Sequence, residues 1–162
     1  MPICKPDLVK HRITDITVDE LRAMGVRALL LDVDNTLTTH DSQELSDEVR
    51  GWLDRMQAAG FSLMIVSNAT EERVKPFADK VGLAFEFRAA KPLGYGFSRA
   101  VRRLNLSKKE CLVIGDQLFT DLLGAKWSRI RVAQVMPIEL EYGKPFMMFK
   151  RRLERVLMKQ KG

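Results

Sequence analysis

Three aspartates in this chain of 162 residues are spaced as ligands of a cation would be. Asp32 and Asp34 stand two positions apart at the end of a short apolar run, and Asp116 follows another apolar run. Carboxylates this close repel each other, which costs free energy unless a cation compensates their charge. Oxygen ligands suit a hard divalent ion, usually Mg²⁺. We therefore predict a Mg²⁺ site at these aspartates, with Thr36 and Asp121 directly behind it.

Ser67, Asn68 and Lys91 are of types that can bind an anion. Ser67 and Asn68 end a second apolar run, and Lys91 follows a weaker one. Each has an ordinary structural explanation: Asp, Ser and Asn form turns or cap helices, and a lone lysine is usually a solvated surface charge. Separate structural explanations do not account for the shared location of these residues, because all of them fall at the ends of successive predicted strands.

Short apolar runs alternate with helical patterns along the chain. The runs predict buried strands at residues 28–34, 61–67, 84–87, 111–115 and 131–135. Amphipathic spacing predicts helices from Ser46 to Gly60 and at residues 71–81, 95–104 and 120–128. This alternation predicts an α/β fold, a doubly wound parallel sheet of about five strands with helices on both faces. Ligands of such folds bind beyond the carboxyl ends of the strands, where the polar residues above are predicted.

The ordered polar residues resemble the motifs of the haloacid dehalogenase-like (HAD) phosphohydrolases. Residues 32–37 (DVDNTL) are similar to the first motif and Ser67 to the second, while Lys91 with Pro92 is similar to the third. Residues 115–121 (GDQLFTD) are similar to the fourth. In detail the sequence resembles the YqeG-type phosphatases of subfamily IIIA, a branch that includes the mitochondrial phosphatidylglycerophosphate phosphatases. The resemblance implies the Rossmann-like HAD fold.

The same resemblance implies covalent catalysis by a carboxylate. Asp32 would attack a phosphate monoester in line and form an aspartyl phosphate. Asp34 would protonate the leaving alkoxide and then deprotonate the water that hydrolyses the intermediate. Mg²⁺, held by Asp32, the Asp34 carbonyl oxygen and Asp116, would screen the repulsion between nucleophile and substrate.

The resemblance also implies how the phosphate is bound. The Ser67 hydroxyl and the Asn68 amide would hold phosphoryl oxygens. Lys91 would neutralise the charge that spreads over the phosphoryl group in the transition state.

The spacing of the motifs leaves no room for a large cap domain over the site. Asp34 and Ser67 are 33 positions apart, and Ser67 and Lys91 are 24 apart, distances that one helix and one strand fill. We therefore expect an open site that admits a phosphate on a bulky molecule or at a membrane surface. A small metabolite stays an alternative, because a loop at residues 38–45, with His40 and Asp41, or an oligomer partner can cover such a site.

The positive charge of the chain is concentrated at its C-terminal end. The chain has 27 Lys and Arg against 21 Asp and Glu, a net charge of +6. Residues 144–162 hold seven basic residues and one acidic residue, so the rest of the chain has 20 of each sign. This location favours a basic last helix at residues 145–160, packed on the domain or facing anionic lipid. Nucleic acid is not favoured, since no aromatic platform or known module accompanies the charge.

The length of the chain predicts one domain over residues 1–162, and the resemblance implies that this domain is HAD-like. The two cysteines, Cys4 and Cys111, make neither a disulfide framework nor a zinc site. No signal peptide or run of about 18–20 apolar residues is present. We expect a cytoplasmic protein, which is peripheral at the inner membrane surface if the basic helix binds lipid. The sequence does not decide between a monomer and a homo-oligomer.

Three functional hypotheses follow. The first is a Mg²⁺-dependent phosphatase acting on phosphatidylglycerophosphate or another bulky substrate, and the second is the same chemistry on a soluble sugar phosphate or nucleotide. The third is a non-catalytic binding or phospho-receiver protein on the same scaffold. The four intact residues Asp32, Asp34, Lys91 and Asp116 favour an enzyme, because a binding scaffold does not need all of them. A second acid beside the acceptor also disfavours a receiver, since it speeds hydrolysis of the acyl phosphate.

Overall fold

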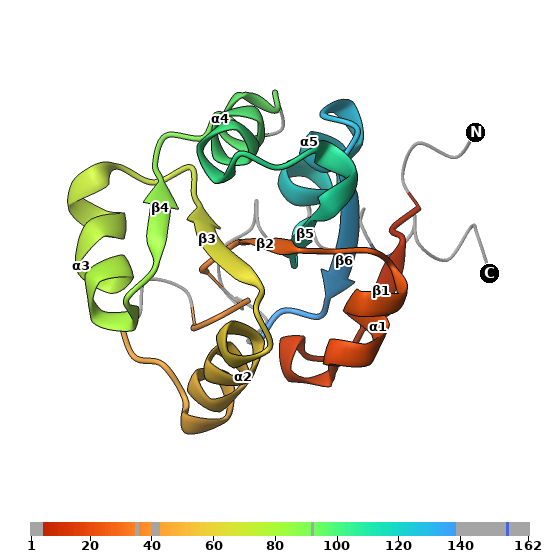
Figure 1. Cartoon of the computed structure of the whole chain (residues 1–162). Helices are drawn as coiled ribbons and strands as arrows, with labels where there is room; N and C mark the ends of the chain where they lie inside the picture. Colours follow the sequence, from red (N-terminus) through yellow and green to blue (C-terminus); the bar gives the residue numbers. More distant parts are fainter. Residues whose placement is uncertain (1–4, 35, 40–42, 92, 139–154, 156–162) are drawn as a thin grey trace.

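A parallel sheet of six strands forms the centre of the molecule (Figure 1). The structure, a computed structural model, describes residues 5–34, 36–39, 43–91, 93–138 and 155. The strands lie in the order β1-β6-β5-β2-β3-β4. Their bounds are β1 Leu8–Lys10, β2 Ala28–Leu31, β3 Ser62–Val66, β4 Ala84–Glu86, β5 Cys111–Gly115 and β6 Arg131–Val135.

The central strand β2 shows why this sheet forms. All four of its residues are buried, and Leu29 lies opposite Leu63 of β3 on one side and Leu112 of β5 on the other. A strand without a polar face can be stable only if both faces of the sheet are covered. Leu29 and Leu31 point into one hydrophobic cluster and Leu30 into the other, as the alternation of a strand requires.

Two layers of helices cover these faces. The 3₁₀ turn η1 (Ile13–Asp15) and the helices α1 (Val18–Ala23), α2 (Asp47–Ala58) and α3 (Glu71–Val81) supply one cluster. The helices α4 (Tyr95–Leu104) and α5 (Leu123–Trp127) supply the other, together with the π-helical turn η3 (Leu118–Leu122). Figure 1 shows α4 and α5 on the side of the sheet opposite α1 and α2. A short 3₁₀ turn, η2 (Lys108–Glu110), precedes β5.

The predicted fold class is confirmed: the sheet is parallel and doubly wound. The predicted helix boundaries at Ser46 and Gly82 are also confirmed. Ser46 accepts a hydrogen bond from the Val49 amide, and Gly82 ends α3 in the left-handed conformation, with φ of 70°.

Three details differ from the prediction. The structure adds β1, a three-residue edge strand too short to give a periodic signal. β2 ends at Leu31, so Asp32 to Asp34 lie beyond the strand rather than in it. The helix expected at residues 120–128 begins instead as a π-helical turn at Leu118 and ends at Trp127.

Some predictions fall on residues that the structure does not describe. His40 and Asp41 are outside the described residues, as is the predicted helix at 145–160 except for Arg155, which is helical and exposed. That one domain spans residues 1–162 stays a prediction. In the described part of the chain, no helix is long and apolar enough to cross a membrane.

Candidate active site

The carboxyl ends of β2, β3 and β5 bring the predicted polar residues to one edge of the sheet. Asp32 follows β2, Ser67 follows β3 and Asp116 follows β5, and β2 is hydrogen-bonded to both of the other strands. One oxygen each from Asp32, Asp116 and Asp121 lies within 4.8 Å of the other two. Three carboxylates at this separation form a donor set that suits a hard divalent cation.

Asp121 therefore belongs to the carboxylate cluster itself, although the sequence placed it behind the ligands. Its position depends on Gly115, because a Cβ atom there would lie only 2.3 Å from the Asp121 Oδ2 atom. The Gln117 amide donates a hydrogen bond to that same oxygen, at 3.2 Å. Because Gly115 has no side chain, it leaves the space that the Asp121 side chain occupies.

Lys91 lies between two of these carboxylates. Its Nζ atom is 2.9 Å from Asp32 Oδ1 and 2.8 Å from Asp121 Oδ1, and its side chain is 3% exposed. The ammonium also stands over the ring of Phe97, 5.9 Å from the centroid. A lone lysine is usually a solvated surface charge, whereas Lys91 is buried and paired with two carboxylates.

Asn68 holds the backbone of Lys91 in place. Its Oδ1 atom accepts a hydrogen bond from the Lys91 amide at 2.8 Å, and its Nδ2 atom donates one to the Lys91 carbonyl at 3.2 Å. The sequence assigned the Asn68 amide to a phosphate oxygen. In the structure the side-chain amide bonds to the Lys91 backbone through both its oxygen and its nitrogen, so Asn68 positions the lysine, and its contact with phosphate stays a prediction.

Ser67 and Thr36 each form a hydrogen bond at the edge of the site. Ser67 is buried, and its Oγ atom accepts a hydrogen bond from the Ala69 amide. The Thr36 hydroxyl donates a long hydrogen bond, 3.4 Å, to Asp116 Oδ1. Gln134 on β6 donates to the Asp116 carbonyl at 2.6 Å and so fixes the backbone of that residue.

Burial sets the electrostatics of the site. It raises the pKa of Asp32 to about 6, against the opposing effect of Lys91 and with the help of the Asp116 charge. It raises the pKa of Asp121 to about 6 as well, with the Asp32 charge adding to the effect. Burial alone would lower the pKa of Lys91, but the charges of Asp121 and Asp32 outweigh it and raise that pKa. The lysine therefore stays charged, and a bound cation would favour the ionised carboxylates further.

An open hollow of about 280 Å³ leads to these groups. Its lining includes all the predicted catalytic and phosphate-binding residues: Asp32, Asp34, Ser67, Asn68 and Lys91. It also includes Arg73, Gln117 and Thr120, which the sequence analysis did not single out.

Arg73 is the most significant of these additional residues. It lies in the first turn of α3, and its Nη2 atom is 3.6 Å from Asp34 Oδ2. The sequence contains a usable signal for it: a basic residue six positions after Ser67, in a helix whose N-terminus follows the strand end. Asp34 thus faces α3 with its carboxylate beside a cation, whereas Asp32 faces Lys91.

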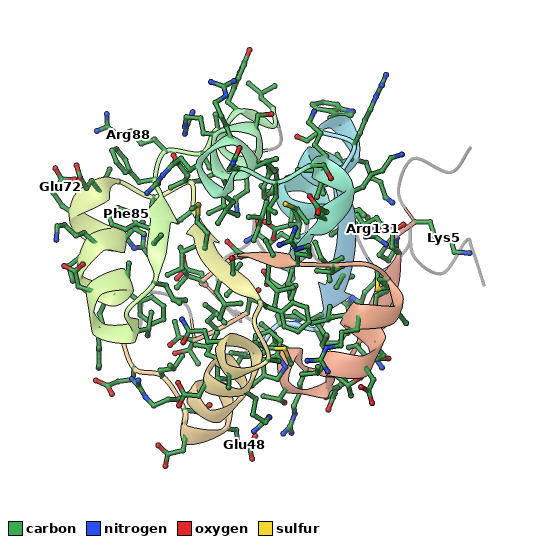
Figure 2. All side chains as sticks on the ribbon, viewed as in Figure 1. Lys5, Glu48, Glu72, Phe85, Arg88 and Arg131 are labelled. Atoms are coloured by element: carbon green, nitrogen blue, oxygen red, sulfur yellow. The ribbon has the colours of Figure 1, made fainter. Side chains whose placement is uncertain are left out.

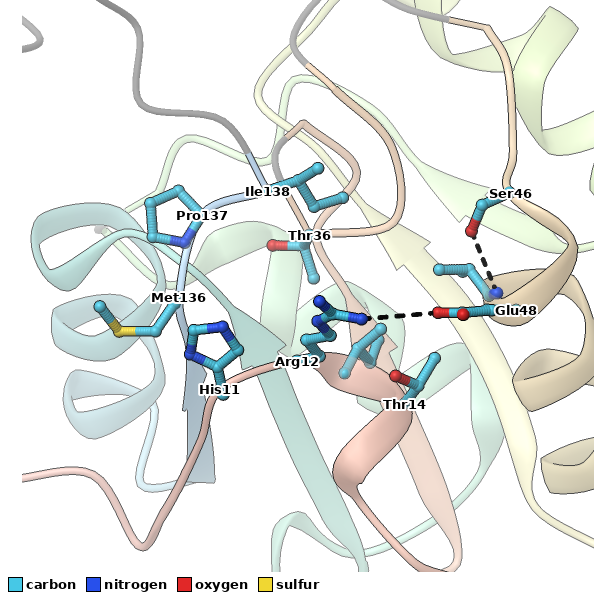
Figure 3. A pocket seen from close by; sticks show the side chains of 11 residues that line it. His11, Arg12, Thr14, Thr36, Ser46, Glu48, Met136, Pro137 and Ile138 are labelled. Carbon is cyan, nitrogen blue, oxygen red and sulfur yellow. Dashed lines mark hydrogen bonds and ion pairs between the residues drawn. The ribbon is translucent and has the colours of Figure 1, made fainter.

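Thr36 also lines a second hollow, of about 250 Å³ (Figure 3). Its walls come from η1, the start of α2 and the segment after β6. Figure 3 shows Arg12 paired with Glu48, 3.7 Å apart, and Ser46 capping α2. Thr36 is its one lining residue from the predicted site, whereas Asp32 and Asp34 line the first hollow and not this one.

Comparison with known proteins agrees with the site. A family model described as haloacid dehalogenase-like hydrolase matches residues 6–129. The chain is 37% identical over 160 residues to the probable phosphatase YqeG of Bacillus subtilis, covering 97% of this chain and 92% of the relative. It is 29% identical over 139 residues to the mitochondrial phosphatidylglycerophosphatase GEP4 of Saccharomyces cerevisiae, covering 76% and 72%.

A solved structure shows the same fold. It comes from Legionella pneumophila and is assigned to subfamily III A of the HAD superfamily. It matches with a TM-score of 0.52 at 20% identity, over 85% of this chain and 78% of the other. The resemblance inferred from the motifs is thereby confirmed, and the chain belongs to the haloacid dehalogenase-like hydrolases.

Proposed function

We propose that this hydrolase is a Mg²⁺-dependent phosphatase that cleaves a phosphate monoester through an aspartyl phosphate on Asp32. The observation that carries the proposal is the position of Asp32: its carboxylate opens into the hollow, with the Lys91 ammonium 2.9 Å away and Asp116 and Asp121 beside it. The relative from Bacillus subtilis, which is named a probable phosphatase, supports the same activity.

Asp32 and Asp34 divide the chemistry. An Asp32 oxygen forms a bond to phosphorus as the ester P–O bond breaks, and Asp34 donates its proton to the departing alkoxide. Asp34 then takes a proton from water, which attacks phosphorus and breaks the bond to Asp32, releasing inorganic phosphate. The separation of roles fits the structure, since Asp32 lies in the carboxylate cluster while the Asp34 side chain is 28% exposed at the hollow.

The remaining residues hold the phosphoryl group. Lys91 supplies a positive charge that is already fixed in place, because Asn68 and the two carboxylates hold both its backbone and its ammonium. Ser67 offers its hydroxyl from the neighbouring strand end. Asp32 and Asp116, with Asp121 or the Asp34 carbonyl oxygen, would hold Mg²⁺, which when bound screens the negative charge of the nucleophile and the phosphate.

For the substrate, we infer a phosphate on a bulky amphiphile of the phosphatidylglycerophosphate type. The site is an open hollow with no cap domain between its motifs in the sequence, so a large group can remain outside while the phosphate enters. The yeast relative, named a phosphatidylglycerophosphatase, supports this class. The proposal includes a peripheral position at the inner membrane surface, with the basic segment at residues 145–160 in contact with lipid.

The test is phosphate release with Mg²⁺ from phosphatidylglycerophosphate in vesicles, from sugar phosphates and from nucleotides. We expect turnover of the lipid, and a loss of roughly 10⁴-fold in Asp32→Asn, which keeps the shape of the side chain and removes the nucleophile. Asp34→Asn should be inactive in turnover while still slowly phosphorylating Asp32. Asp54→Asn, an exposed acid on α2, is the matched control and should retain activity.

Other outcomes separate the alternatives. Activity near the wild-type level in Asp32→Asn would exclude this mechanism. Turnover of sugar phosphates or nucleotides alone would retain the chemistry and exclude the lipid substrate. A single phosphorylation of Asp32 without turnover would identify a phospho-receiver.

A further inference from the structure

The two helical layers carry different charge, although residues 1–143 sum to zero. Residues 88–109 and 122–131, which include α4 and α5, contain no acidic residue, and the one acid of the neighbouring turn η3, Asp121, is buried in the active site. Their ten basic residues are Arg88, Lys91, Arg99, Arg102, Arg103, Lys108, Lys109, Lys126, Arg129 and Arg131. The opposite layer mixes both signs. In Figure 2, Glu48 lies on α2 and Glu72 on α3, and Arg88 lies beyond the end of β4, near Glu72.

Part of this positive charge has no acidic partner. Glu86 at the end of β4 accepts from Arg99 at 3.0 Å and from Arg103 at 2.9 Å. Lys126 is paired with Asp7, at 2.7 Å. Five exposed cations of this layer form no ion pair within the described part of the chain: Arg88, Arg102, Lys108, Lys109 and Arg129. Their charge therefore faces solvent and attracts an anionic surface.

Three large apolar side chains are exposed on the same layer. Leu93 is 61% exposed, Tyr95 63% and Trp127 58%. The backbone between the first two touches α5, because a Cβ atom at Gly94 would lie 2.4 Å from Ser128 Oγ and 3.8 Å from the Gly124 carbonyl oxygen. Trp127 is three positions after Gly124 and so shares that face of α5. We call these three side chains the apolar patch.

Basic residues follow the apolar patch closely along the chain. On α4, Arg99 and Arg102 follow Tyr95 at helical spacing, and thus line the same outer stripe of the helix. Arg129 is two positions after Trp127. Surfaces that insert at the interface of an anionic bilayer typically combine Tyr and Trp rings, aliphatic side chains and surrounding cations. The apolar patch and its neighbours have this composition.

We propose that the α4–α5 layer is a docking surface for an anionic lipid membrane, with the apolar patch inserted at the headgroup level. Leu93 is two positions after Lys91, so docking through this layer places the active-site hollow beside the bilayer. A membrane fits better than single-stranded nucleic acid, whose bases need a series of stacking rings along a groove. This surface is separate from residues 145–160, and its binding does not depend on the phosphatase activity.

The test uses the full chain and vesicles of phosphatidylcholine, with and without phosphatidylglycerol. We expect co-sedimentation with the anionic vesicles only, and equally in Asp32→Asn. Arg102→Gln with Arg129→Asn should weaken binding roughly 20-fold, since each basic residue near such a surface contributes about fivefold. Asn suits position 129, whose φ of 59° is left-handed. Arg50→Gln with Arg55→Gln removes the same charge from exposed positions on α2 and should bind as the wild type does.

Tryptophan fluorescence locates the contact. The chain has two tryptophans. Trp52 is fully buried and donates to the Ile16 carbonyl, so only Trp127 should shift to shorter wavelength on vesicle binding. Trp127→Phe should bind and lose this shift, and Tyr95→Ser with Trp127→Ser should lose binding. The proposal would be overturned if the α4–α5 and α2 charge variants bound vesicles equally, or if the wild type showed no fluorescence shift. It would also be overturned if the protein bound single-stranded RNA and not vesicles.

Discussion

Lys91 pairs with the buried Asp121 and the half-buried Asp32, and its removal should reduce stability as well as activity. In Lys91→Met, Asp32 and Asp121 would face each other without the cation that lies 2.9 Å and 2.8 Å from them. Breaking a buried pair in this way costs about 3 kcal/mol of unfolding free energy. The cost should be largest near pH 8 and smaller near pH 5, because both carboxyl groups, whose pKa is about 6 with Lys91 in place and higher without it, take up protons as the pH falls.

Urea unfolding in EDTA at the two pH values measures this difference. Lys75→Met is the matched control, since Lys75 forms an exposed pair with Asp79 on α3 and its loss should change stability little at either pH. An equal loss of stability in Lys91→Met at both pH values would contradict the proposed repulsion.

The affinity for Mg²⁺ should depend on protons at the same carboxylates. A cation binds the ionised form, and in the metal-free protein burial raises the pKa of Asp32 to about 6. Below that pH a proton must leave before Mg²⁺ binds, so affinity should rise about tenfold per pH unit up to pH 6 and then level off. Calorimetric titration between about pH 5 and pH 8 tests this, with Asp32→Asn expected to bind weakly and without the same pH dependence. A constant affinity would show that Asp32 does not compete with protons for the metal.

At the scale of elements, Gly115 connects the end of β5 to the turn that follows it. A Cβ atom at this position would lie 2.3 Å to 2.6 Å from three atoms of the Asp121 side chain. Gly115→Ala should therefore displace Asp121, weaken Mg²⁺ binding by at least about tenfold and destabilise the fold by about 1–3 kcal/mol. Gly51→Ala is the contrasting variant: its Cβ would meet only the end of Arg55 at 3.5 Å, so better helix propensity should stabilise α2 by about 0.5–1 kcal/mol. Thermal melts and Mg²⁺ titration check both variants, and unchanged Mg²⁺ binding in Gly115→Ala would contradict the assignment.

The strand ends could be predicted from the sequence because they depend on local patterns. Apolar runs place Asp32, Ser67 and Asp116 after β2, β3 and β5, and parallel strands bring such ends together. The link between Asn68 and Lys91 could not be predicted, since it joins residues 23 positions apart through a side chain that has an ordinary capping role. The π-helical turn was also missed, because the apolar spacing of residues 118–127 fits an α-helix equally well.

At the scale of the whole molecule, summing charge along the chain hides where it lies. The total charge of residues 1–143 is zero because acidic residues elsewhere offset the ten basic residues of residues 88–109 and 122–131. The sequence alone could not reveal this, because it does not state which helices cover which face of the sheet. The hydrophobic clusters assign α1, α2 and α3 to one face and α4 and α5 to the other, and only then does the segregation become visible.

In the described part of the chain the first strand, β1, pairs with the last, β6, and this topology predicts how the protein unfolds. Asp7 accepts hydrogen bonds from the Val132 amide at 2.9 Å and from Lys126 at 2.7 Å, across 125 and 119 residues of chain. Contacts this distant have the highest loop-closure cost, so β1 should join the edge of the sheet after the folding transition state. Asp7→Ala should then destabilise by about 1–2 kcal/mol, through unfolding about 5- to 30-fold faster with an unchanged folding rate.

Stopped-flow kinetics in urea distinguish this order from its reverse. Val113→Ala, in the buried centre of β5, is the comparison and should slow folding, because the central strands must pair before either edge can form. If Asp7→Ala slowed folding by its full loss of stability, β1 and β6 would belong to the nucleus. The sheet would then grow inward from the edge that joins the two ends of the fold, rather than outward from β2 and β5.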